Sequence, residues 1–198
     1  RSPGRAQRFS AFRAEHGRGL EDFALWCALR ELHGEADPIW QELSPFGAQA
    51  DEWRERLRDR IDFHCWLQWV LDEQLAAAQE TSRQAGMGVG IVHDLAVGVH
   101  PRGSDAWTLR DVLAAGAEVG APPDMYNQQG QNWSQPPWHP GRLADAGYRP
   151  FRDMLRTILR HAGGIRVDHV LGLFRLWWVP IGLPASEGAY VYYDHEAL

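Results

Sequence analysis

The sequence predicts an α/β fold, either a barrel or a doubly wound parallel sheet, because two helix-to-strand units follow one another along the chain. A helical region at 51–85 leads into an apolar run at 88–99, and a helix at 151–161 leads into a second apolar strand at 165–170. The first run is apolar almost throughout and is bounded by glycines, which is typical of a strand buried on both faces of a parallel sheet. Since a complete (β/α)₈ barrel takes about 250 residues, we expect only part of such a fold.

The N-terminal part of the chain is predicted to be mostly helical. Residues 20–34 carry acids in the first turn, a histidine in the last turn and Gly34 at the position where a helix commonly ends. Apolar residues recur at three-to-four spacing through 51–85, which indicates an amphipathic helix. Residues 1–19 fit a short helix or a lead-in loop, and Asp-Pro and Ser-Pro pairs predict a loop at 35–50.

Charged residues fall late in both predicted strands. Asp94 lies toward the C-terminal end of 88–99, while Arg166 and Asp168 alternate along 165–170 and so point to the same side. A guanidinium close to a carboxylate favours its ionised form and fixes its orientation, as a nucleophile requires. The alternative is a structural Arg–Asp pair at a strand end, which is common and often inert.

The connection between the two strands, at about 100–148, is unusually long and is rich in Gly, Pro, Asn, Gln and Trp. Loops of this length in a compact domain are commonly functional. Within it, 120–133 interleaves amides, which exchange hydrogen bonds with hydroxyls, and aromatic rings, which stack on sugar C–H surfaces. We expect a sugar-binding loop, the alternative being an insertion held in place by its own Trp and Pro residues. Farther on, 188–195 predicts a short aromatic edge strand or loop.

The composition restricts the class of partner. A net charge of −6 does not offer the basic face that nucleic acid or an anionic membrane requires. Cys27 and Cys65 lie in predicted helices without zinc-ligand spacing, so we expect neither a disulfide scaffold nor a metal cluster. No apolar run approaches ~18 residues, and the N-terminus lacks a signal-peptide core. We therefore expect a cytoplasmic protein with no nucleic-acid or membrane partner.

Three classes of function fit these residues differently. Asp94 and Asp168, together with Arg166 and an amide-rich loop, suit glycosyl transfer through a covalent glycosyl-enzyme. A metallohydrolase could use the adjacent pairs His93–Asp94 and Asp168–His169 as ligands, but neighbours on a strand point to opposite faces and do not readily bind one ion. A non-catalytic glycan-binding module would explain the loop and leave the Arg–Asp pair without a role.

Five segments, in this order and spacing, resemble those of the bacterial 4-alpha-glucanotransferases (amylomaltase or disproportionating enzyme), which are related to the alpha-amylase superfamily: 94–99, 120–124, 130–133, 166–169 and 172–175. The resemblance covers 91–198, and 20–79 is similar to a helical insertion that precedes these segments in the family.

This resemblance implies part of a (β/α)₈ TIM barrel with a helical insertion, and with a long loop insertion between two barrel strands. The expected domains are a mostly helical insertion subdomain at 1–60 and a partial catalytic barrel at 61–198, which contains the substrate-binding loop insertion at about 100–148.

By the same resemblance, Asp168 matches the catalytic nucleophile, Arg166 the arginine that positions it, and Asp94 an aspartate that supports the hydrogen-bond network of the site. The implied substrate-binding residues lie mainly in a mobile loop that closes over the glucan, and they are Asp124, Tyr126, Gln131, Asn132, Trp133 and His169. Met125 stands where many members of the family have an aromatic residue, which puts stacking at that position in doubt.

The implied activity is the transfer of alpha-1,4-glucan segments between maltooligosaccharides, with retention and with no cofactor or metal. The family's acid/base glutamate lies on a later strand, and Glu187 and Glu196 do not stand in the matching context. Because the chain also lacks an initial Met, we expect an incomplete, inactive segment that works with the remainder of its parent polypeptide. The alternative within the superfamily is an alpha-amylase-type hydrolase.

Overall fold

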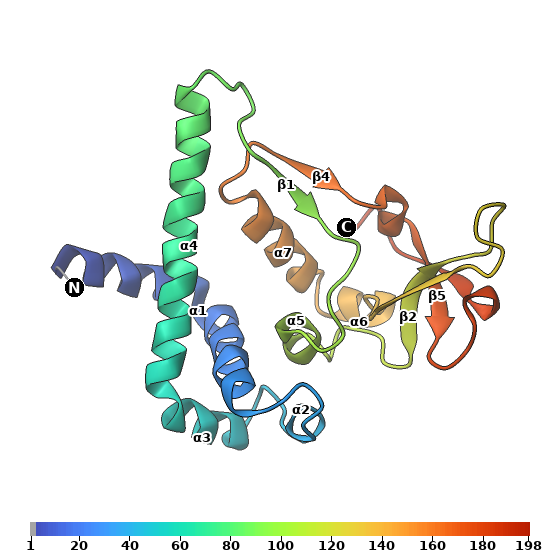
Figure 1. Cartoon of the computed structure of the whole chain (residues 1–198), viewed down its shortest axis with the longest axis horizontal. Coiled ribbons are helices and arrows are strands. Elements are labelled where there is room, and N and C mark those ends of the chain that lie inside the picture. The colour runs from blue at the N-terminus through green and yellow to red at the C-terminus, as the bar shows by residue number, and fades with distance from the viewer. Residues whose placement is uncertain (1–2) are drawn as a thin grey trace. The chain divides into compact units, whose positions relative to one another are not determined.

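The chain divides into two compact units in the computed structural model, which describes residues 3–198 (Figure 1). The helical unit comprises Arg1–Thr81 and the mixed unit comprises Ser82–Leu198. The boundary expected between residues 60 and 61 falls inside a single helix, α4 (Arg58–Gln84). The compact units separate near the end of that helix, and the domain bounds expected from the sequence stay a prediction.

Over the described residues the helical unit consists mainly of helices, as its sequence pattern predicts. They are α1 (Pro3–Leu32), α2 (Ile39–Glu42), α3 (Ala48–Arg56) and α4. Of the two alternatives for 1–19, the helix is correct over residues 3–19, and residues 1–2 lie outside the described range. The helix is kinked at Gly17, where φ is 53° and ψ is −136°. Glycine adopts this left-handed value of φ without the clash that a Cβ would cause. The expected loop at 35–50 contains α2 and the start of α3.

Long apolar side chains from α1 and α4 form the core of the helical unit. Leu25 and Leu29 of α1 are fully buried, as are Cys65 and, almost entirely, Trp69 of α4. The rings of Phe9 and Trp69 lie 5.6 Å apart, centre to centre. Burying a side chain of this size stabilises the fold by about 1.5–3 kcal/mol. Burial also raises the pKa of the Cys65 thiol to about 12, which leaves it a packing residue.

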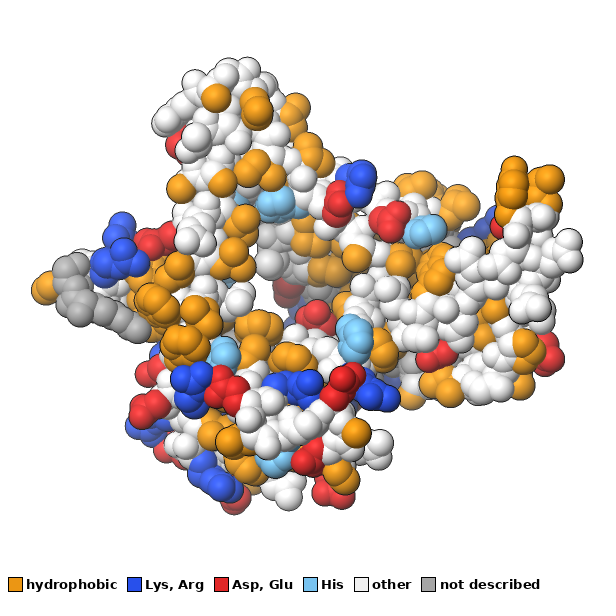
Figure 2. All heavy atoms as spheres, in the orientation of Figure 1, with side chains coloured by type: hydrophobic (Ala, Val, Ile, Leu, Met, Phe, Trp, Pro, Cys, Tyr) orange, Lys and Arg blue, Asp and Glu red, His pale blue; other side chains and the backbone are white. Residues whose placement is uncertain are grey.

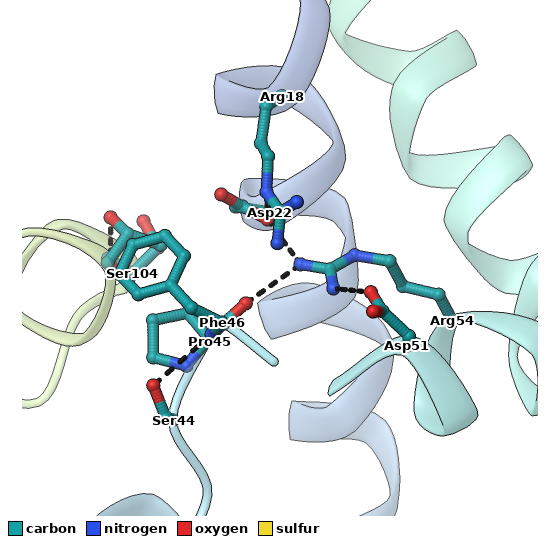
Figure 3. A network of polar contacts seen from close by, with 9 residues as sticks. Arg18, Asp22, Ser44, Pro45, Phe46, Asp51, Arg54 and Ser104 are labelled. Atoms are coloured by element: carbon teal, nitrogen blue, oxygen red, sulfur yellow. Dashed lines mark hydrogen bonds and ion pairs between the residues drawn. The ribbon is translucent and has the colours of Figure 1, made fainter. Parts of the chain in front are cut away.

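A charged network joins α1, α3 and the segment between α2 and α3 (Figure 3). The guanidinium of Arg54 donates hydrogen bonds to Asp22 and, at 2.9 Å each, to the Asp51 carboxylate and the Pro45 carbonyl oxygen. The Asp22 side chain is only 7% exposed. Burial raises its pKa, and the nearby guanidinium groups of Arg54 and Arg18 oppose that effect. Arg54 therefore satisfies a carboxylate that water does not reach.

In the mixed unit, the two predicted barrel-type strands are confirmed as parallel neighbours. β1 (Val92–Leu95) pairs in register with β4 (Gly164–Val167). The helix expected at 151–161 is α7 (Arg149–Leu159), which contacts both strands, as Figure 1 shows. This arrangement confirms the α/β class. Membership of a (β/α)₈ barrel stays a prediction.

The expectation that 88–99 is one strand buried on both faces is wrong. β1 covers only four of these residues, and Val92 is 51% exposed, whereas Leu95 is buried. The physical reason is the number of neighbours: among the described residues β1 pairs with β4 alone. An apolar run shows that a strand could be buried on both faces. Whether it is buried depends on neighbouring strands and helices, and the described residues provide β1 with one strand neighbour.

The connection at 100–148 is more regular than the loop that we expected. It contains α5 (Ser104–Thr108), β2 (Ala117–Ala121), β3 (Gln131–Gln135) and α6 (Pro140–Asp145). β2 and β3 join β5 (Arg175–Pro180) and β6 (Ala189–Tyr192) in an antiparallel sheet of order β3-β2-β5-β6. For the aromatic segment at 188–195 the sequence predicts an edge strand or a loop, and the edge strand, β6, is correct. Residues 109–116 and 136–139 lie outside the helices and strands, and the turn between β2 and β3 is an open loop.

This antiparallel sheet has a core of its own. Val119 and Val179 are completely buried, and Leu176 and Tyr193 nearly so. The Tyr193 hydroxyl donates a hydrogen bond of 2.9 Å to the Trp138 carbonyl oxygen, and burial raises its pKa to about 12. Short 3₁₀ turns flank β5 at Val170–Leu173 (η1) and Ala185–Glu187 (η2). The strand expected at 165–170 therefore ends at Val167 and gives way to η1.

Candidate active site

The register between β1 and β4 places Asp94 directly opposite Arg166. The Arg166 Nη2 group donates to Asp94 Oδ2 at 2.5 Å, and the side chains are 73% and 57% exposed respectively. We expected Arg166 to contact Asp168, its neighbour two residues along the same strand. Adjacent strands lie about 4.8 Å apart, whereas residues i and i+2 are about 6.6 Å apart. The cross-strand carboxylate is therefore the nearer partner.

Asp168 follows the last residue of β4 at the carboxyl end of the parallel pair. Its N–H donates to the Leu95 carbonyl oxygen at 3.0 Å, so its backbone is fixed by the end of β1. Its carboxylate is exposed and lies 4.0 Å from Nε2 of His169. His169 itself has φ of 50°, a left-handed conformation that turns the chain out of the strand and into η1. Asp168 is thus presented to solvent from an anchored backbone.

Two of the predicted loop residues lie beside this strand end. The Trp133 ring packs on the His169 ring with centroids 4.7 Å apart and planes tilted by 38°. The Trp133 indole N–H donates to Gln131 Oε1 at 3.0 Å, since residues i and i+2 of β3 share a face. The structure therefore brings together Gln131, Trp133, His169 and Asp168, from two segments far apart in the sequence.

Asn132 uses its side chain within the hairpin. Its Nδ2 group donates to Glu118 Oε2 at 2.6 Å, and its Oδ1 atom accepts from the Ser134 N–H at 2.8 Å. Ser134 has φ of 57°, and the β2–β3 register shifts between Val119 and Gly120. Asn132 therefore stabilises an irregular turn of β3. The Glu118 partner was not predicted from the sequence, whereas the bond to the Ser134 N–H is of a known kind, because Asn side chains commonly bind the backbone two residues on.

Asp124 and Tyr126 lie in the open loop between β2 and β3. Asp124 Oδ1 accepts from the Tyr126 N–H at 2.8 Å and from the Asn127 N–H at 2.6 Å, which closes a tight turn. Tyr126 is 91% exposed, and hydrophobic side chains gather at this loop tip, at the upper right of Figure 2. Gly120 permits the hairpin, because a Cβ there would collide with the Gln131 carbonyl oxygen.

The two His/Asp pairs differ in how their side chains lie. Asp168 and His169 lie beyond the end of β4, and His169 Nε2 is 4.0 Å from Asp168 Oδ2, so the expectation that they face opposite sides of a strand is wrong for this pair. His93 Nδ1 lies 2.8 Å from the Ile158 carbonyl oxygen of α7, whereas Asp94 on the other side of β1 binds Arg166. This confirms that the two neighbours on β1 face opposite ways. Within residues 3–198 no three His, Cys, Asp or Glu side chains are grouped so as to hold a metal ion. Over the same residues, no helix combines the length and apolarity that crossing a membrane requires.

A family model described as 4-alpha-glucanotransferase matches the chain over residues 1–198. The chain belongs to the 4-alpha-glucanotransferase family. Among curated members of this family, the 4-alpha-glucanotransferase of Mycobacterium tuberculosis (strain H37Rv) is 54% identical over 200 aligned positions, which cover 100% of the chain and 28% of the relative. That of Haemophilus influenzae is 43% identical and is matched by 80% of the chain over 22% of its own length.

Solved structures of the family give the same result. The crystal structure of amylomaltase from Corynebacterium glutamicum is similar with a TM-score of 0.85 and 54% identity, over 100% of this chain and 26% of that one. An amylomaltase from Streptococcus agalactiae, in complex with acarbose, has a TM-score of 0.84 at 19% identity, and so shows likeness of fold alone. The chain spans about a quarter of the length of its mycobacterial 4-alpha-glucanotransferase relatives, 28%.

Proposed function

We propose that the polypeptide containing this chain transfers alpha-1,4-glucan segments between maltooligosaccharides, and that Asp168 is its nucleophile. The observation that carries the proposal is the position of Asp168. It is an exposed carboxylate anchored at the carboxyl end of a parallel strand pair, next to the Asp94–Arg166 ion pair. Catalytic groups of (β/α)₈ barrels occupy this end of the strands. Membership of the family supports the reaction class.

The proposed reaction is a double displacement. The Asp168 carboxylate attacks the anomeric carbon of the donor glucan and forms a glycosyl ester, while the bond to the leaving glucan breaks and its oxygen takes a proton from a general acid. The 4-hydroxyl of an acceptor glucan then attacks the same carbon, gives its proton to that group acting as a base, and releases Asp168. Two inversions at one carbon give net retention.

The Asp94–Arg166 pair is assigned a supporting role in this site. Asp94 holds the guanidinium of Arg166 at the edge of the strand pair that also carries Asp168. A fixed cation there favours the ionised form of the nucleophile and its departure as a carboxylate. Arg166 donates its hydrogen bond to Asp94, and so we assign its effect on Asp168 to the positive charge that this bond holds in place.

The general acid is assigned to a glutamate of the parent polypeptide outside residues 1–198. Glu187 lies in η2, on the antiparallel sheet, and the Glu118 carboxylate accepts a hydrogen bond from Asn132. We therefore propose that this chain forms part of a (β/α)₈ barrel and that the 198-residue chain is inactive by itself. Disproportionation of maltotriose by the purified chain would contradict that proposal.

The product distribution of the parent polypeptide tests the function. With maltotriose as the sole substrate, a transferase produces glucose together with a ladder of longer maltooligosaccharides. Asp168→Asn, which keeps the shape of the side chain and removes its charge, should abolish both. Production of shorter sugars alone would contradict transfer and identify an alpha-amylase-type hydrolase.

A further inference from the structure

The side chains of Gln131 and Trp133 form a pair on one face of β3. The Gln131 side-chain oxygen accepts the Trp133 indole N–H at 3.0 Å. This bond uses one of the two lone pairs of that oxygen and fixes the direction of the indole ring about its side-chain torsions. Gln131 therefore takes part in this bond through its acceptor oxygen, and its amide N–H₂ group is not involved.

The Trp133 ring lies between the antiparallel sheet and the end of β4. On one side it packs against a core cluster formed by Val119, Leu176 and Tyr193. On the other side it contacts the His169 ring. A change in the ring's direction would consequently be felt by His169, because the sheet core leaves the indole little room to move elsewhere.

His169 controls how the chain leaves the strand that carries Asp168. Its backbone is left-handed, a conformation unfavourable for a residue with a Cβ, and its carbonyl oxygen accepts from the Gly172 N–H at 2.7 Å. Such a conformation persists where surrounding contacts hold it. The ring contact with Trp133 is the aromatic contact that the structure provides to this residue.

We propose that Gln131 is a positioning residue, which orients the Trp133 ring against His169 and thereby fixes the peptide that carries Asp168. The inference rests on the proposed function of Asp168 and deepens it, by assigning Gln131 a role other than direct sugar binding. The proposed role requires an acceptor oxygen in the side chain at position 131 and a donor N–H in the side chain at position 133.

Three substitutions separate this role from sugar binding. Gln131→Glu keeps an acceptor oxygen of the same reach and removes the amide N–H₂, whereas Gln131→Met keeps the length and removes the acceptor. Trp133→Phe keeps a ring in place and removes the donor. If Gln131 acts through Trp133, Gln131→Glu should be less impaired than Gln131→Met, and Gln131→Met and Trp133→Phe should share one defect. Gln74→Met, on the exposed face of α4, is the matched control for losing a Gln amide.

The structural readout uses the 198-residue chain. In a ¹H–¹³C spectrum of the chain with labelled histidine, assigned with His169→Asn, the ring protons of His169 should be shifted upfield by the Trp133 ring current. We expect the shift in the unchanged chain, in Gln131→Glu and in the control, and a marked reduction in Gln131→Met. An unaltered shift in Gln131→Met would overturn the proposal. Amide spectra establish that each variant is folded.

The catalytic readout uses the parent polypeptide. Gln131→Met and Trp133→Phe should lower kcat by about fivefold, the effect of losing one ordinary hydrogen bond, with KM for maltotriose little changed, because binding contacts remain. Gln131→Glu should lower kcat less than Gln131→Met does. A Gln131→Glu variant as impaired as Gln131→Met would overturn the proposal in favour of direct binding. The two readouts test different proposals. An active Asp168→Asn variant would contradict the assignment of Asp168 as nucleophile, whereas the ring-current shift tests the contact between Trp133 and His169 in either case.

Discussion

The replacement of Arg54 by methionine should destabilise the helical unit far more than the loss of an ordinary surface arginine. Arg54 is the cation that reaches Asp22, and the same guanidinium holds the Pro45 carbonyl oxygen. Methionine keeps much of the aliphatic length and removes every donor. The variant therefore leaves a nearly buried carboxylate beside Arg18 alone, which approaches it only to 3.6 Å.

The magnitude follows from the environment of Asp22. Removing one partner of a buried ion pair costs about 3–5 kcal/mol, because the other charge is left without compensation. Arg58 provides a matched control, since it pairs with Glu55 at 2.5 Å but both side chains are more than two-thirds exposed. Exposed pairs contribute about 0–1 kcal/mol. Arg58→Met should accordingly cost less than about 1 kcal/mol.

The loss in Arg54→Met should also depend on pH. Burial raises the pKa of Asp22 in the folded state above its ordinary value of 3.8, so the native state binds this proton more tightly than the unfolded state. That contribution to stability is fully present below the unfolded pKa and is lost as the pH rises through the folded pKa. Without Arg54 the folded pKa rises further. The deficit relative to the unchanged chain should thus be larger at pH 7 than at pH 4.

Urea denaturation followed by far-ultraviolet circular dichroism, at both pH values, measures these differences, because the long helices α1 and α4 belong mainly to the helical unit. A deficit below about 1 kcal/mol at pH 7, equal to that of the exposed control, would refute the reasoning. So would a deficit of 3–5 kcal/mol that is the same at pH 4 and pH 7, because it would then owe nothing to the charge of Asp22.

Three further predictions concern the parent polypeptide. Trp133→Ala should raise the ratio of hydrolysis to transfer from maltotriose, since a gap beside His169 admits water; an unchanged ratio would count against a water-excluding loop. Asp124→Asn should keep transfer to a labelled glucose acceptor within about twofold, whereas Asp124→Ala should reduce it about tenfold. The reason is that only asparagine retains an oxygen for the two hydrogen bonds of the turn. Equal losses in the two variants would indicate that the charge of Asp124 itself binds sugar. Arg166→Met should lower kcat about a hundredfold and change the unfolding free energy by less than about 1 kcal/mol, since its pair with Asp94 is exposed; the opposite pattern would make the pair structural.

The parallel pair at the centre of the fold could be predicted from the sequence because its signal is local. The apolar run at 88–99 and the strand pattern at 165–170, each preceded by a helical segment, predict the type of these elements and their order, although not their bounds. The strands of the hairpin were not found. β2 reads Ala-Glu-Val-Gly-Ala, with a single β-branched residue, and pairing with β5 rather than propensity makes it a strand.

The residues of the candidate site could be named from the sequence, but their partners could not. Arg166 was assigned to Asp168 by spacing along one strand, whereas the register across two strands gives it Asp94. The two strands are far apart in the sequence, with 72 positions between Asp94 and Arg166, so a short window of sequence does not contain both partners. The family resemblance implies a substrate-binding role for Asn132, whereas its amide donates a hydrogen bond to Glu118, fourteen positions away. Such contacts follow only once the hairpin is known.

The assignment of Asp168 as nucleophile is tested most directly by trapping the covalent intermediate. A 5-fluoro glycosyl fluoride of the alpha-glucose series, incubated with the parent polypeptide, should accumulate a glycosyl-enzyme because the fluorine slows its breakdown. Peptide mass spectrometry should place the sugar on the peptide that contains Asp168, and Asp168→Asn should remain unlabelled. A sugar found on any other residue would contradict the assignment. So would inactivation of the polypeptide by the reagent without any label on Asp168.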